Sequence, residues 1–184
     1  MADEPKLNSA ELPHVELRQP TVAAILAWLW PGAGHLYQGR YGKGILYMVC
    51  IVSTWFFGLS LGGGHAVYAS NRGIGRCLVF GCQLGVGVPA FPALVQAMRV
   101  TRGQQPLAGG IMAPPREGGA FDDLSEWNYK YGAAFDLGVL YTMVAGLLNI
   151  LAIYDAYGGP MISPPEEDKN RKPPDTPENE AKKT

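Results

Sequence analysis

The sequence predicts an all-α protein, a polytopic membrane helical bundle of about four spans with a short interfacial helix and disordered tails. Three observations predict this class. Four long stretches contain no Asp, Glu, Lys or Arg: 19–39, 44–71, 77–98 and 137–154. Charges crowd instead into residues 1–18 and 164–184, so the net charge of −1 hides a segregated pattern. Glycine is frequent, with 24 in 184 residues, and recurs in these stretches at spacings that let membrane helices pack closely.

The length of the charge-free stretches sets the expected organisation. A helix needs about 20 mostly apolar residues to cross a bilayer, and a soluble surface helix would alternate apolar with charged faces. We place a bundle over residues 19–160, with spans at about 21–38, 45–62, 77–99 and 133–157. A polar tail at 1–18 and a disordered tail at 161–184 flank it.

Composition argues against several functional classes. The nearly balanced charge predicts no nucleic-acid partner. The three cysteines form no Cys-x-x-Cys pair, so neither a zinc site nor a disulfide framework is expected. Residues 1–18 lack the basic start and apolar core of a secretory signal.

The first apolar run is interrupted by Pro31 and Gly32. A proline inside a membrane helix is tolerated where neighbours satisfy the freed carbonyl, so we expect a kink, with a re-entrant segment as the alternative. Gly39, Gly42 and Gly44 then permit a tight reversal before the second span. Arg40 and Lys43 would meet lipid phosphates there.

The turn between the first two spans carries a family resemblance. Its motif residues are Pro31, Gly32, Gly34, His35, Tyr37, Gly39, Arg40, Gly42, Lys43 and Gly44. Over residues 21–61 this pattern resembles the hairpin of the two-transmembrane-helix domain family, although Gly34-His35-Leu36 replaces the Asp-Arg-Phe triplet of many members. The segment 144–156 looks like the closing span of an uncharacterised bacterial family built around such hairpins. The resemblance implies a fold and a place in the bacterial cytoplasmic membrane, and no activity.

The third span and the loop after it offer little chemistry. Pro89 and Pro92 predict a bend, and Gln83 and Gln96 are the polar groups of the span, so we interpret it as a packing element. A loop at 100–122 follows. Asp123 and Glu126 then have capping-box spacing, which predicts an interfacial helix at 123–132.

The last span shows a stripe of small residues. Ala134, Gly138, Thr142 and Gly146 recur every four residues, and Asn149 lies close to the same stripe. Such a face lets helices touch backbone to backbone, and Thr142 or Asn149 can add an interhelical hydrogen bond. We expect the stripe to face the bundle.

Two carboxylates flank this span, and ionisable groups near a membrane are candidates for function. Four spans would place Asp136 on the side of Arg40 and Lys43. They would place Asp155 on the side of Arg72 and Arg76, and we expect structural ion pairs at both. His35 could titrate, or bind a metal or haem, but a hydrogen bond within its own turn is the favoured interpretation.

These observations predict a non-enzymatic structural or assembly component, without catalytic, metal or cofactor sites. Its expected partners are the lipid bilayer and either further copies of itself or other membrane proteins. The alternative is a small transporter or lipid-handling protein that uses Asp136 or Asp155 with nearby Arg or Lys. Lys and Arg near the span ends are equally divided between the two sides, so orientation rests on a weak preference for cytoplasmic tails.

Overall fold

A computed structural model describes residues 19–116 and 122–159 of the chain. Within these residues it contains seven α-helices, two short 3-10 helices and no strand, which confirms the all-helical class. The predicted tails at 1–18 and 161–184, and part of the predicted loop at 100–122, lie outside the described residues.

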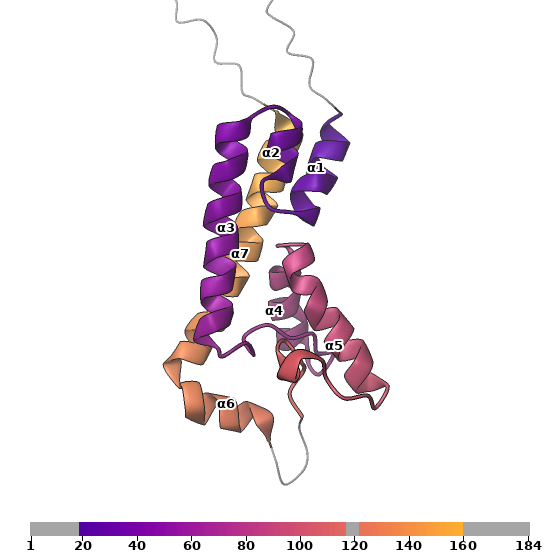
Figure 1. Cartoon of the computed structure of the whole chain (residues 1–184), viewed down its shortest axis with the longest axis vertical. Helices are drawn as coiled ribbons and strands as arrows, with labels where there is room; N and C mark the ends of the chain where they lie inside the picture. Colours follow the sequence, from indigo (N-terminus) through magenta and orange to yellow (C-terminus); the bar gives the residue numbers. More distant parts are fainter. Residues whose placement is uncertain (1–18, 117–121, 160–184) are drawn as a thin grey trace, which may run out of the picture.

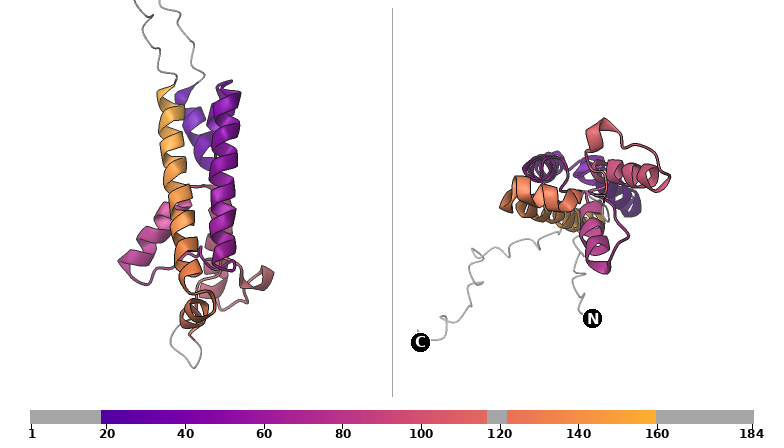
Figure 2. Two further views of the ribbon diagram at one scale, coloured as in Figure 1. Left: turned by 90° about the vertical axis from the view of Figure 1, so that its left-hand side faces the viewer. Right: turned by 90° about the horizontal axis from the view of Figure 1, so that it is seen from below.

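The bundle is built on two long helices. α3 (Tyr41–Leu61) and α7 (Ala133–Gly158) run antiparallel and lie side by side (Figures 1 and 2). Both are long and apolar enough to cross a membrane. Their backbones meet at two glycines: a Cβ on Gly58 would lie 2.9 Å from the carbonyl oxygen of Gly138, and a Cβ on Gly138 would lie 2.6 Å from that of Gly58. Only glycine permits this approach on both sides.

The bundle has two ends. At the Asp155 end, α1 begins and α7 ends (Figure 1). At the α6 end, α3 passes into the connector 62–73 and α6 leads into α7.

The first apolar run forms two short helices instead of one kinked span. α1 (Pro20–Leu29) descends from the Asp155 end, and α2 (Ala33–Tyr37) returns toward it (Figure 1). Gly32 makes the reversal at φ +82°, a backbone conformation that glycine adopts without steric cost. α1 and α2 pack so closely that a Cβ on residue 34 would collide with the backbone of Ala23, and Gly34 has none. At 21–38 the chain thus turns back to the end of the bundle where it began, and the predicted single kinked helix is not formed.

The predicted span 77–99 is also broken. α4 (Ile74–Leu84) rises from the α6 end, η1 (Val88–Ala90) turns the chain, and α5 (Phe91–Thr101) descends again (Figure 1). Gly87 stands in the break at φ +82°, and a Cβ there would collide with the carbonyl oxygen of Trp28. The two broken segments therefore extend into the bundle from opposite ends, and they are in contact at Trp28 and Gly87. Two helices suited to spanning are described, and the count of four is not confirmed.

A short helix and a folded loop cover the α6 end. α6 (Asp123–Tyr131) precedes α7, and η2 (Ala108–Gly110) lies in the loop after α5. Buried Gln96 holds that loop: its Nε2 donates to the carbonyls of Leu107 and Ile111, and its Oε1 accepts from the amide of Leu107. The N-cap of α6 is Asp122, not Asp123 as its spacing predicts.

Large apolar side chains lie both in the core of the bundle and on its outer surface. Only 22% of the apolar window of α3 and 33% of that of α7 is buried. Many large apolar side chains of α3 and α7 are exposed, although Trp55 and Ile51 of α3 lie in the core. Apart from Phe135, the buried face of α7 carries small or polar residues: Gly138, Thr142, Ala145, Gly146, Asn149, Ala152 and Ala156.

Candidate functional site

The centre of the bundle is organised around Asn149. This side chain is fully buried, and its Nδ2 donates to the carbonyl oxygens of Ala27 at 3.0 Å and Gly85 at 2.9 Å. Ala27 lies in the last turn of α1 and Gly85 is the C-cap of α4, so one amide joins the ends of these two helices to α7. Since the last carbonyls of a helix lack partners within it, Asn149 satisfies groups that would otherwise be buried unbonded.

The small-residue stripe provides the close contacts around this amide. Gly138 faces α3, as described above, and Gly146 faces α4, where a Cβ would collide with the carbonyl of Cys82. Thr142 is buried between these two glycines and bonds the carbonyls of Gly138 and Val139. Ala134 is only half-buried.

A second cluster lies at the Asp155 end. His35 is fully buried, and its Nε2 lies 2.7 Å from Oδ2 of Asp155. Arg40 and Lys43 approach the same carboxylate oxygen at 3.3 and 3.5 Å. Gln38 donates to the carbonyl of Ala156. The glycine-rich turn thereby binds the end of α7 through four side chains.

This cluster corrects the expected ion pairs. Asp155 contacts Arg40 and Lys43 because the broken run returns the chain to the end where it began, whereas a complete first span would have carried both cations to the other end. Arg72 and Arg76 lie at the α6 end, before and within the first turn of α4. His35 bonds α7 and not its own turn.

Asp136 begins α7 at the α6 end, and it lines a cavity of about 250 Å³ together with Arg76 of α4. Buried Gln83 lines the same cavity, and so do Tyr68 of the connector and Asn128 of α6. Ala66, Val79, Leu124, Phe135 and Val139 complete the wall. This inner cavity lies between α4, α6 and α7 and combines apolar walls with opposite charges.

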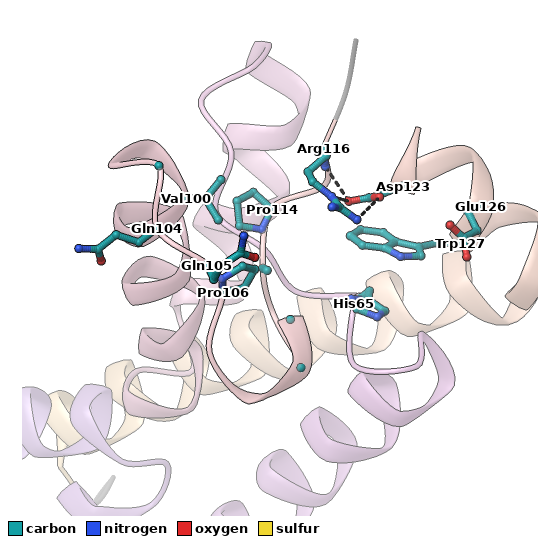
Figure 3. Close-up of a pocket in the computed structure, with 14 residues that line it drawn as sticks. His65, Val100, Gln104, Gln105, Pro106, Pro114, Arg116, Asp123, Glu126 and Trp127 are labelled. Carbon is teal, nitrogen blue, oxygen red and sulfur yellow. Dashed lines mark hydrogen bonds and ion pairs between the residues drawn. The ribbon is translucent and has the colours of Figure 1, made fainter. Parts of the chain in front are cut away.

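A larger cavity of about 600 Å³ lies on the other side of α6, under the loop 103–116 (Figure 3). The imidazole of His65 stacks on Trp127, with ring centroids 4.3 Å apart and planes 12° from parallel. Burial lowers the pKa of His65, and the neighbouring Asp123 carboxylate opposes this effect. A neutral imidazole is thereby favoured against the indole.

The wall of this outer cavity is fastened by an ion pair. Nε and Nη2 of Arg116 lie 3.0 and 3.2 Å from the two carboxylate oxygens of Asp123, and the amide of Arg116 also donates to Asp123. The guanidinium lowers the pKa of the Asp123 carboxyl below its ordinary value. This pairing explains why Asp123 does not cap its own helix and Asp122 does.

Sequence reasoning identified Asn149, Asp136, Asp155 and the turn motif as polar sites, but not the two cavities. The sequence predicts a packing role for Gln83, and the stacking of His65 on Trp127 joins residues 62 positions apart with no signal in the local pattern. Among residues 19–116 and 122–159, no group of three or more His, Cys, Asp or Glu side chains is arranged to hold a metal ion.

Comparison with known proteins gives one match. A model described as "Family of unknown function (DUF6677)" matches residues 22–169. Comparison with curated proteins and with solved structures finds no match. The match agrees with the expectation of an uncharacterised family and does not test the resemblance to the two-transmembrane-helix hairpin.

Proposed function

We propose that this chain, which belongs to the DUF6677 family of unknown function, is a multi-pass membrane protein with a structural or assembly role. In this proposal α3 and α7 cross the bilayer. The α1–α2 and α4–α5 segments enter it from opposite faces as half-helix hairpins and meet near its middle.

The observation that carries the proposal is the exposure of large apolar side chains along the two long helices. Ile45, Leu46, Val49, Phe56 and Phe57 of α3 are all more than half exposed, as is Leu151 of α7. Apart from Phe135, the α7 face that packs in the bundle is lined by glycine, alanine, threonine and asparagine. In lipid this arrangement is favourable, because apolar side chains outside cost nothing and small residues inside allow close packing.

The broken helices support the same environment. Irregular backbone at membrane depth is tolerated where protein buries it and satisfies its polar groups. Here Asn149 bonds the ends of α1 and α4, and Gly87 is packed against Trp28. A closely packed centre in which one amide bonds the ends of two helices suits a rigid scaffold that presents its two ends to partners.

The structural role is favoured over a solute path through the centre because of the packing at mid-height. Gly85 and Gly146 are in backbone contact there, with a Cβ on Gly85 only 2.7 Å from the carbonyl of Gly146. Such contact closes the space between α4 and α7 at this level.

Cell fractionation tests the proposal. We expect the full chain to remain in the membrane pellet after alkaline carbonate washing and to require detergent for extraction. Purified protein should then show one helical species in mild detergent. Recovery of folded, monodisperse protein from the aqueous fraction without detergent would overturn it.

A further inference from the structure

The centre of the bundle gathers oxygen atoms from three segments of the chain. α1 and α4 extend from opposite ends of the bundle, and both end at mid-height (Figure 1). There Nδ2 of Asn149 donates to the carbonyl oxygens of Ala27 and Gly85, at 3.0 and 2.9 Å. Since the last carbonyls of a helix have no partner within it, the carbonyl ends of both short helices converge on one side chain of α7.

Asn149 also carries a buried acceptor without a partner. Because a carbonyl can only accept, its two hydrogen bonds fix which atom of the Asn149 amide is the nitrogen. The remaining atom, Oδ1, is buried and has no hydrogen-bond partner in the part of the chain that the structure describes. The whole side chain is fully buried. A buried oxygen of this kind is costly unless a donor or a cation satisfies it.

The break between α4 and α5 adds two more oxygens to this centre. A Cβ on Gly87 would collide with the carbonyl oxygen of Trp28 and would lie 2.8 Å from that of Leu29. Both carbonyls therefore lie against Gly87, at the end of α1. Within residues 19–116 and 122–159, no backbone amide donates to either of them. The contacts of Asn149 and Gly87 thus hold three unbonded oxygens in one cluster.

The helix ends give this cluster a negative potential. The carboxyl end of a helix carries about half a negative charge and the amino end about half a positive charge. α1 and α4 both direct their carboxyl ends to the centre. α5 begins nearby at Phe91, whose ring centroid lies 6.0 Å from that of Trp28, so its amino end offsets one of them. The stretches 19–39, 77–98 and 137–154 contain no Asp, Glu, Lys or Arg that could balance the remainder.

We propose that this centre binds one monovalent alkali cation, sodium, which ties α1 and the α4–α5 segment to α7. Its ligands are Oδ1 of Asn149 and the carbonyl oxygens of Trp28 and Leu29, and the carbonyls of Ala27 and Gly85 each keep a second lone pair. Neutral carbonyl oxygens suit hard cations, and broken membrane helices bind sodium through these same groups. A divalent ion would call for carboxylate ligands. The site does not depend on the proposed membrane location.

Thermal unfolding tests the proposal with the full chain in mild detergent. The protein is prepared in N-methyl-D-glucamine chloride, and sodium chloride replaces this salt stepwise at constant ionic strength. A ligand that binds only the folded chain raises the unfolding midpoint. At a sodium concentration about ten times the dissociation constant, we expect the midpoint to rise by about 3–6 °C. Equilibrium dialysis with radioactive sodium should show saturable binding that approaches one ion per chain.

Two variants locate the ion. Asn149→Leu removes Oδ1, so it should abolish saturable sodium binding and the sodium-dependent shift. Gln96→Leu is the matched control, because it also removes a buried amide, but one that holds the loop after α5. It should unfold at a lower temperature and keep the full sodium shift.

The proposal is overturned if the unaltered chain unfolds at the same midpoint in both salts and dialysis detects no saturable sodium. It is also overturned if folded Asn149→Leu binds sodium like the unaltered chain, or if Gln96→Leu loses the shift as completely as Asn149→Leu does. Should Asn149→Leu fail to fold, the comparison of the unaltered chain in the two salts decides alone.

Discussion

Replacing Asn149 by Leu tests whether one buried amide holds the two broken segments together. The substitution keeps a side chain of similar size and removes the donor. Two hydrogen bonds, of 3.0 and 2.9 Å, are lost, and the carbonyls of Ala27 and Gly85 remain buried. Hydrogen bonds between membrane helices contribute about 0.6–1.7 kcal/mol each. We therefore expect the free energy of unfolding to fall by about 1–3 kcal/mol.

The assay is reversible unfolding in mixed micelles, followed by circular dichroism. Asn149→Ala should also be destabilised, which separates loss of the hydrogen bonds from poor fit of leucine. Ser53→Ala is the control, because Ser53 lies on the exposed face of α3 and bonds only the carbonyl of Cys50 in its own helix. It should change stability by less than about 0.5 kcal/mol. If Asn149→Leu also changed the free energy of unfolding by less than about 0.5 kcal/mol, the Asn149 amide would not hold α1 and α4 to α7.

Three further predictions concern packing, pH and charge. Gly138→Ala should lower the free energy of unfolding by about 1–3 kcal/mol, because its Cβ meets the backbone of α3. Gly75→Ala should be neutral or stabilising, because no atom lies within 4 Å of the added Cβ. Unfolding in mixed micelles compares the two variants. The pKa of His65 is lower in the folded chain, so the unfolded chain binds more protons as the pH drops below about 6.5. The free energy of unfolding should therefore fall over that range. His65→Phe keeps the aromatic stack and should flatten this pH profile. Asp155→Asn should lower the free energy of unfolding by about 1–2 kcal/mol in low salt and by less in high salt, because this carboxylate is partly exposed and salt screens its ion pairs. An equal loss at both salt concentrations would contradict an ionic contribution.

The long helices could be predicted from the sequence because their signal is local. Two of the four charge-free stretches contain α3 and most of α7, and the four-residue spacing of Gly138, Thr142 and Gly146 defines one helical face, which is buried in the structure. Each of these inferences needs only neighbours along the chain.

The paths of the broken segments could not be predicted in the same way. Pro31 with Gly32 signals an interruption, but whether the chain continues across or turns back depends on a contact made 118 residues later, between Gln38 and Ala156, and on Asn149. Because that choice decides the end at which Arg40 lies, the predicted partners of Asp155 were wrong. The inner cavity depends similarly on three elements, α4, α6 and α7, meeting in space.

The most direct test of the central claim is the sidedness of two single cysteines. With Cys50, Cys77 and Cys82 replaced by alanine, Tyr41→Cys and Tyr129→Cys are labelled in sealed vesicles with a membrane-impermeant maleimide; both positions are exposed. Two spans with two half-helix hairpins predict labelling from opposite sides. Labelling of both positions from the same side would mean that residues 77–99 cross the membrane as a second span after α3, and would contradict the account.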